Sequence, residues 1–207
     1  MGVEVPAPFY NGLTPSKDAF KGRASMARVP YVNREDMDAE GQQIYDRIRN
    51  DRNSPTVGLQ FRAMLHSPKA ASHLTSMGAQ LRFQSAIPEN LKEFAIILAA
   101  REWGSDIEWT AHAALAAKAG VSAAAIEAVR TRKVPSGLTA DEKIIAAFVL
   151  SLLQQKTLPD EAFAAAQKLL GTRGVVDLTL TCSYYTAICM AQVAFKPEME
   201  PGKASTL

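Results

Sequence analysis

The chain has 207 residues, of which 47% are hydrophobic and 21% charged, as in ordinary soluble globular domains. At roughly 150 residues per domain, this length predicts one domain with at most a short appendage. The 23 basic and 21 acidic residues leave a net charge of +2, which argues against a protein that binds nucleic acid or another polyanion. Alanine, the residue with the best helix propensity, is abundant in the middle of the chain, so an all-α fold is favoured.

The sequence offers no evident segment that would direct the chain to a membrane. Its first residues lack the basic stretch and apolar core of a secretory signal, and the most apolar run, 144–153, is about half the length of a membrane span. Cys182 and Cys189 lie seven residues apart in a predicted helix, too far apart for a disulfide between them. We therefore expect buried thiols and a cytoplasmic protein without a membrane partner.

The first third of the chain divides into an irregular arm and two predicted helices. Residues 1–33 are rich in Pro and Gly and predict an extended N-terminal arm. Apolar residues recur at helical spacing after Asn33, whose side chain we expect to cap this helix, and the pattern breaks at 51–58. A second helix is expected from Ser67, with Pro68 at its first position.

Two helices separated by a tight turn follow. Pro88 opens the first, and Gly104 ends it. The next begins with Ser105-x-x-Glu108, the pattern of a capping box, in which each side chain binds the backbone N–H of the other residue. Gly120 marks the end of this helix.

Four further helices are expected in the C-terminal half, at 122–131, 139–155, 159–170 and 175–195. The second opens with another capping box, Thr139-x-x-Glu142. The last contains several β-branched residues that a strand would also accommodate, but its length and its end at Pro197 favour a buried helix. The predicted fold is therefore all-α, with one helical domain at 34–197 and a C-terminal tail at 198–207.

Side chains from two neighbouring helices converge in this prediction. Glu108 and His112 are four residues apart and share one helix face. Glu93 is the one acid in an apolar stretch of the preceding helix, which the turn at Gly104 makes antiparallel. At ~1.5 Å per residue, Glu93 and His112 both lie roughly 12–15 Å from that turn. Two carboxylates and an imidazole at one level, with Trp109 beside them, suit proton transfer.

Each of these residues also has a structural explanation. Glu108 completes a capping box, Glu93 could pair with a cation on a neighbouring helix, and Trp109 could belong to the core. A lone histidine such as His112 on an alanine-rich helix is more often a surface or core residue than a catalytic one. From the residues alone, the catalytic interpretation stays one of several.

Three segments, LKEFAIIL at 91–98, EWTAH at 108–112 and AGVS at 119–122, resemble a known family. They are similar to the carboxymuconolactone decarboxylase family of the alkylhydroperoxidase-D-like superfamily. The specific resemblance covers about 87–130, and a wider pattern takes in most of the chain after residue 33. It implies an alkylhydroperoxidase-D-like helical bundle that assembles as a homo-oligomer, a trimer or hexamer. It also implies no bound cofactor or metal.

The chain departs from the peroxidase branch of that superfamily. Those enzymes carry Cys-x-x-Cys-x-x-x-His, and the two cysteine positions counted back from His112 hold Ser105 and Glu108 here. No thiolate is available at this site, so thiol-dependent peroxide reduction is excluded there. Glu93 and His112 match the acidic and histidine positions of the superfamily motif, and Glu-Trp-x-x-His matches the decarboxylase-like branch.

The resemblance implies a carboxy-lyase that acts on a small carboxylated lactone or a related ring compound. His112 would be the leading acid/base and Glu108 would orient it or share its proton. Glu93 would be a second acid/base or an orienting group, and Trp109 would wall the pocket and exclude water. The substrate carboxylate needs a positive partner, for which Arg101 is a candidate.

Other interpretations stay open. Arg82 is a second candidate for the carboxylate, and Tyr184 and Tyr185 could line a pocket, although core packing is the favoured explanation for both. A related isomerase or hydrolase reaction could use the same groups. A non-catalytic helical oligomer that binds a small hydrophobic molecule is another possibility, and so is metal chemistry with Glu93, Glu108 and His112 as ligands.

Overall fold

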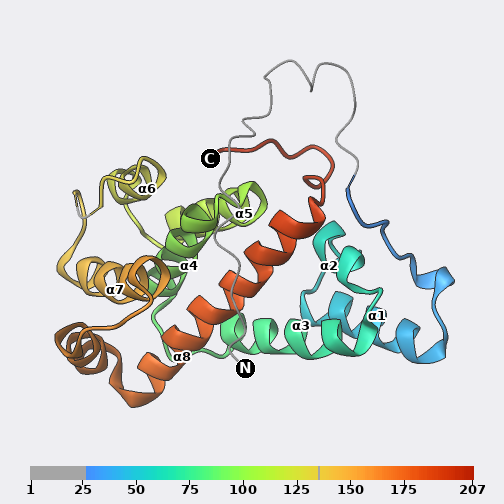
Figure 1. Cartoon of the computed structure of the whole chain (residues 1–207), viewed down its shortest axis with the longest axis horizontal. Coiled ribbons are helices and arrows are strands. Elements are labelled where there is room, and N and C mark those ends of the chain that lie inside the picture. The colour runs from blue at the N-terminus through green and yellow to red at the C-terminus, as the bar shows by residue number, and fades with distance from the viewer. Residues whose placement is uncertain (1–26, 135) are drawn as a thin grey trace, which may run out of the picture.

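The computed structural model describes residues 27–134 and 136–207, and within these ranges every regular element is a helix (Figure 1). The helices are α1 (Ala39–Asp51), α2 (Leu59–Met64), α3 (Pro68–Phe83), α4 (Glu89–Trp103), α5 (Asp106–Lys118), α6 (Ala123–Arg130), α7 (Ala140–Leu150) and α8 (Asp160–Phe195). A 3-10 turn, η1 (Arg34–Asp36), precedes α1, and a π-helical turn, η2 (Ser151–Gln155), follows α7. The predicted all-α class is confirmed for this part of the chain.

Helix α4 is the centre of the fold because it is buried on every side. The ten residues from Leu91 to Ala100 are all buried, and all of them except Lys92 and Glu93 are apolar. Phe94 and Ile97 pack into one hydrophobic cluster with α5, α6, α7 and the middle of α8. Ile96 and Ala99 pack into a second cluster with α1, α2, α3 and the last part of α8. In Figure 1, α8 runs between these two groups of helices.

The predicted helix starts are partly correct. The capping box of α7 is present, with Thr139 and Glu142 each bound to the other's backbone N–H. Asn33 makes no side-chain cap bond and precedes only the short turn η1, whereas α1 begins at Ala39 with Asp38 as its N-cap. Helix α2 was not predicted, since it has only six residues and its N-cap residue is Gly58.

Helix α8 contains the break that the sequence predicts at Gly171. This glycine has φ 70° and ψ 175°, so two helical segments meet there at a kink. The segment from Gly174 onward is helical rather than extended and buries one face, as predicted. Within the described residues, α8 alone is long and apolar enough to cross a membrane, a property that the core helix of a globular protein also has.

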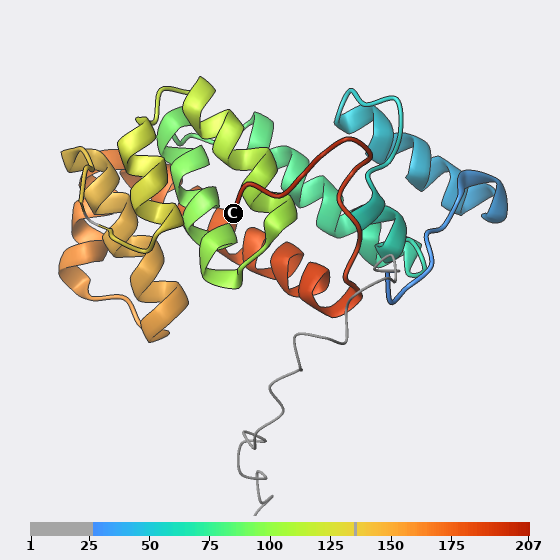
Figure 2. The same cartoon turned by 90° about the horizontal axis from the view of Figure 1, so that it is seen from above.

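The C-terminal tail is held against α2 and α5 by hydrogen bonds. The Glu200 carboxylate accepts a hydrogen bond of 2.8 Å from the backbone N–H of Leu59 at the start of α2. Ser205 donates to Asp106 and the backbone N–H of Thr206 donates to Thr110, both on α5. Figure 2 shows this segment crossing from the end of α8 to α5. Of the predicted arm, 1–26 lies outside the described residues.

Candidate active site

The imidazole of His112 lies between two buried carboxylates. Its Nδ1 is 2.6 Å from Oε2 of Glu93, and its Nε2 is 3.3 Å from Oε2 of Glu108. The three side chains are at most 6% exposed, so water does not screen these contacts. The sequence predicted this convergence from helix spacing, and α4 and α5 do bring the three groups together.

A fourth group, Tyr185 on α8, completes the surroundings of the imidazole. Its hydroxyl lies 3.2 Å from Nε2 of His112, and the two rings meet edge to face with centroids 5.0 Å apart. Burial raises the pKa of Tyr185 well above its usual value of 10.0, so the phenol is neutral at physiological pH. From the sequence, core packing is the favoured explanation for Tyr185, because nothing local links it to a histidine 73 positions away.

Glu108 is oriented by a hydrogen-bonded chain that the sequence did not reveal. Gln192 on α8 donates from Nε2 to Oε1 of Glu108 at 2.7 Å, and its own Oε1 accepts from Ser105. Gln60 also contacts the Gln192 amide. Ser105 caps α5 as predicted, but the Glu108 carboxylate does not complete the capping box, since it faces His112 and Gln192 instead.

The carboxylates favour the protonated imidazole. Burial lowers the pKa of His112, but the hydrogen bonds and charges of Glu108 and Glu93 outweigh it and hold this pKa above its ordinary 6.5. Burial likewise raises the pKa of Glu108, and its bonds to His112 and Gln192 outweigh that effect and lower it below 4.5. The contacts around His112 therefore favour its protonated form, and those around Glu108 favour the ionised carboxylate.

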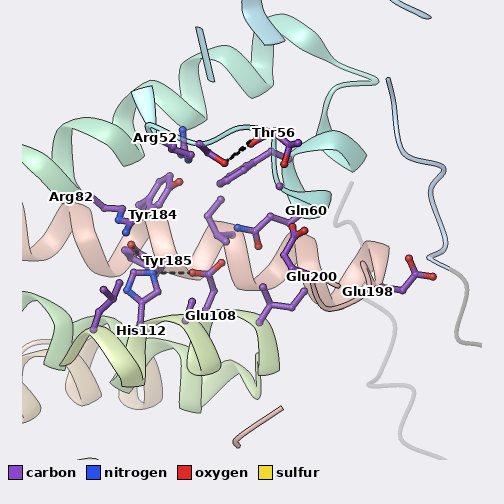
Figure 3. Close-up of a pocket in the computed structure, with 17 residues that line it drawn as sticks. Arg52, Thr56, Gln60, Arg82, Glu108, His112, Tyr184, Tyr185, Glu198 and Glu200 are labelled. Carbon is purple, nitrogen blue, oxygen red and sulfur yellow. Dashed lines mark hydrogen bonds and ion pairs between the residues drawn. The ribbon is translucent and has the colours of Figure 1, made fainter. Parts of the chain in front are cut away.

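His112 and Glu108 border a cavity of about 390 Å³ (Figure 3). Its wall is formed by the loop between α1 and α2, by α2, α3, α5 and α8, and by the C-terminal tail. The lining residues are Arg52, Ser54, Thr56, Gly58, Gln60, Phe61, Arg82, Ile107, Glu108, Ala111, His112, Leu115, Tyr184, Tyr185, Ile188, Glu198 and Glu200. Glu93 is not part of the wall and lies behind His112. Glu93 is therefore placed to hold the imidazole, whereas Glu108 and His112 face a bound molecule.

The structure separates the two arginines proposed for the substrate carboxylate. Arg82 lines the cavity, whereas Arg101 donates to the backbone carbonyl of Arg130 at 2.7 Å and borders a different hollow. Trp109 is 1% exposed and packs in the core cluster rather than on the cavity wall. Arg52, which no pattern in the sequence indicates, also lines the cavity.

No protein-family model and no curated protein matches this chain.

The cysteines are unsuited to thiolate chemistry. Cys182 and Cys189 are free and buried in α8, as predicted. Burial raises the pKa of each thiol to about 12, so both stay protonated near neutral pH.

Among the described residues, no group of three or more His, Cys, Asp or Glu side chains is arranged to hold a metal ion.

Proposed function

We propose that this chain is a carboxymuconolactone-decarboxylase-like carboxy-lyase that acts on a small carboxylated lactone or related ring compound by cofactor-free acid/base chemistry. The observation that carries the proposal is the pairing of His112 with two buried carboxylates at the wall of the cavity. An ion pair that served stability alone would not need a histidine that borders a cavity. The site resembles an acid held ready for a bound substrate.

The two nitrogens of His112 have different tasks in this proposal. Nδ1–H donates to Glu93 at 2.6 Å, a short charge-assisted bond that fixes the ring. Nε2–H has only longer contacts, 3.3 Å to Glu108 and 3.2 Å to Tyr185. Nε2 is therefore the proton donor, and Glu108 and Tyr185 hold its proton in position until a substrate takes it.

The reaction is a decarboxylation with protonation at carbon. The bond between the ring and the carboxylate carbon breaks, carbon dioxide leaves, and the electron pair passes into the conjugated ring as a dienolate. Nε2–H of His112 then protonates a ring carbon, and a proton from water restores the imidazolium. One proton is consumed for each carbon dioxide released. The positive charge on His112 also stabilises the dienolate before the proton moves.

The proposal includes assembly as a homo-oligomer, a trimer or hexamer, as the family resemblance implies. The face of α8 that carries Val176, Leu180 and Met190 supports it, since these side chains are 40–52% exposed. At about 100° per residue, the three lie within about 80° of one another around the helix. Exposed apolar side chains gathered on one face are typical of protein interfaces.

Carbon dioxide release from a panel of small carboxylated lactones and ring carboxylates tests the activity. We expect release by the wild-type protein and a loss of about 10²–10⁴-fold in the His112→Gln variant, the usual contribution of a general acid. His73→Gln, an exposed histidine on α3, is the matched control and should keep full activity. Equal turnover by His112→Gln would refute the mechanism, and binding without any product would favour the non-catalytic binder.

A further inference from the structure

Two guanidinium groups line the cavity without a carboxylate partner. Arg52 follows the last turn of α1, and Arg82 lies in the last turn of α3. Among the described residues, neither makes an ion pair, whereas the arginines on the surface of α1 do: Arg47 pairs with Asp51, and Arg49 with Asp46. Two partly buried positive charges in one cavity provide a place for an anion.

Arg52 is held in place with one donor unused. Its guanidinium lies over the ring of Phe61, 4.3 Å from the ring centroid, and Nη2 makes one long contact of 3.5 Å to the carbonyl of Thr75. Its Nη1 is buried and has no hydrogen-bond partner. Arg52 nevertheless borders the cavity, and none of its contacts within the described residues is to a carboxylate. A guanidinium in this position suits a carboxylate ligand, because arginine binds carboxylates through parallel N–H groups.

Tyr184 lies near the two arginines. It lines the cavity, and Figure 3 shows its ring beside both Arg52 and Arg82, at the end of the cavity nearest His112. Burial raises the pKa of Tyr184 to about 12 against the opposing charges of Arg52 and Arg82, so the hydroxyl stays protonated and can donate. The ring can occupy this place only because residue 78 is glycine, where an added Cβ would lie 2.1 Å from the Tyr184 hydroxyl.

The other end of the cavity is negative. Glu198 and Glu200 reach it from the C-terminal tail, on the far side of Gln60 from the arginines (Figure 3). Both are fixed, since Glu198 accepts a hydrogen bond of 2.8 Å from Tyr31 and Glu200 accepts one of 2.8 Å from the backbone of Leu59. A molecule with a negative group at each end would place one of them against these carboxylates.

We propose that Arg52 and Arg82 form a subsite for one carboxylate and that Glu198 and Glu200 exclude a second. The substrate class is then a small monocarboxylate whose far end is neutral. This inference rests on the proposed function only for the reaction that follows binding. The charge of the ligand and the residues that bind it can both be tested without turnover.

Titration calorimetry of the full chain with benzoate and terephthalate tests the charge selection, since the two probes differ only in the second carboxylate. We expect benzoate to bind at least tenfold more tightly than terephthalate, because like charges placed together disfavour binding. A Glu198→Gln/Glu200→Gln double variant should reduce this difference. Equal affinity for the two probes, or no binding of benzoate, would overturn the proposal without the use of any variant.

Arginine variants test the subsite. Arg52→Gln and Arg82→Gln should each weaken benzoate binding by at least tenfold, and Arg101→Gln, which removes an arginine outside the cavity, should leave it unchanged. Wild-type affinity in both cavity variants, or an equal loss in all three, would contradict the assignment. Benzoate binding by the wild-type chain is measured without any turnover, so a failure of the catalytic proposal is distinguished from a failure of the subsite.

Discussion

Removing the imidazole of His112 would leave Glu93 and Glu108 as two buried carboxylates without the cation between them. Loss of one partner from a buried ion pair costs about 3–5 kcal/mol. We therefore expect the His112→Gln variant to lose about that much free energy of unfolding in the pH range where the pair is complete. Urea denaturation measures this loss, and His73→Gln, which changes an exposed histidine, should show almost none.

The size of this loss should depend on pH. Because the pKa of His112 is raised in the folded protein, its contribution is complete below its ordinary 6.5 and disappears as pH rises through the folded-state value. The pKa of Glu108 is lowered, so its contribution is complete above 4.5 and disappears as pH falls through its folded-state value. The stability difference between wild type and His112→Gln should be widest between 4.5 and 6.5. A constant difference across pH would contradict the ion pair.

At the level of residues, the sequence predicted the contacts that arise from two adjacent helices and missed those that depend on α8. Glu93 and His112 could be aligned because a short turn relates their positions along α4 and α5. Gln192 lies 84 positions from Glu108, and no local pattern indicates that its amide reaches that carboxylate. Its position is set by how α8 packs on α4, which side-chain shape decides.

Among the elements, α3 carries a position that shapes the cavity. Gly78→Ala should increase the helix propensity of α3 by about 1 kcal/mol. The new Cβ would nevertheless meet the Tyr184 hydroxyl at 2.1 Å, and Tyr184 is 3% exposed and has little space to move. We expect a net loss of about 1–3 kcal/mol, as for overpacked cores, together with weaker benzoate binding.

Thermal unfolding and calorimetry measure both effects of the glycine substitution. Gln80→Ala, at an exposed position of the same helix, is the control and should alter neither quantity. A Gly78→Ala variant that is more stable than wild type and binds benzoate normally would show that Tyr184 is not confined by α3.

Helix boundaries were predictable where a side chain or a special backbone conformation marks them. Gly104 has φ 64° at the end of α4, and Gly171 has φ 70° at the kink of α8, conformations that glycine adopts without strain. Asn33 has the right residue type for a cap, but α1 starts at Ala39 with Asp38 as its N-cap, and Asp38 offers the same chemistry five residues after Asn33. Two equivalent cap residues so close together cannot be ranked from the sequence.

For the whole molecule, the exposed face of α8 predicts self-association. We expect the wild-type chain to have the mass of a trimer or hexamer in size-exclusion chromatography with light scattering. Met190→Glu should lower this mass, because Met190 is 52% exposed on that face and a buried charge in an interface is costly. Gln167→Glu, an exposed polar position on the same helix, should not. A monomeric wild-type chain would refute the assembly.

The cavity itself is a property of the whole fold, which is why the sequence indicated Arg82 as a candidate but neither Arg52 nor Glu200. Arg52, Arg82 and Glu200 come from the end of α1, the end of α3 and the tail. Only the packing of these elements around α8 brings them together, and their spacing along the chain carries no signal. From the sequence, Arg101 was as plausible as Arg82 for binding the substrate carboxylate, because it lies near the end of α4, shortly before the helix that carries His112.

The central feature of the proposed site is a buried imidazole, that of His112, which two carboxylates favour in its protonated form. An NMR titration of the imidazole nitrogens measures this directly, with His66 and His73 as exposed internal references and His112→Gln to assign the signal. We predict a pKa for His112 above 6.5 in the wild-type protein and a lower pKa in Glu93→Gln. A pKa at or below 6.5, unchanged by Glu93→Gln, would contradict the account.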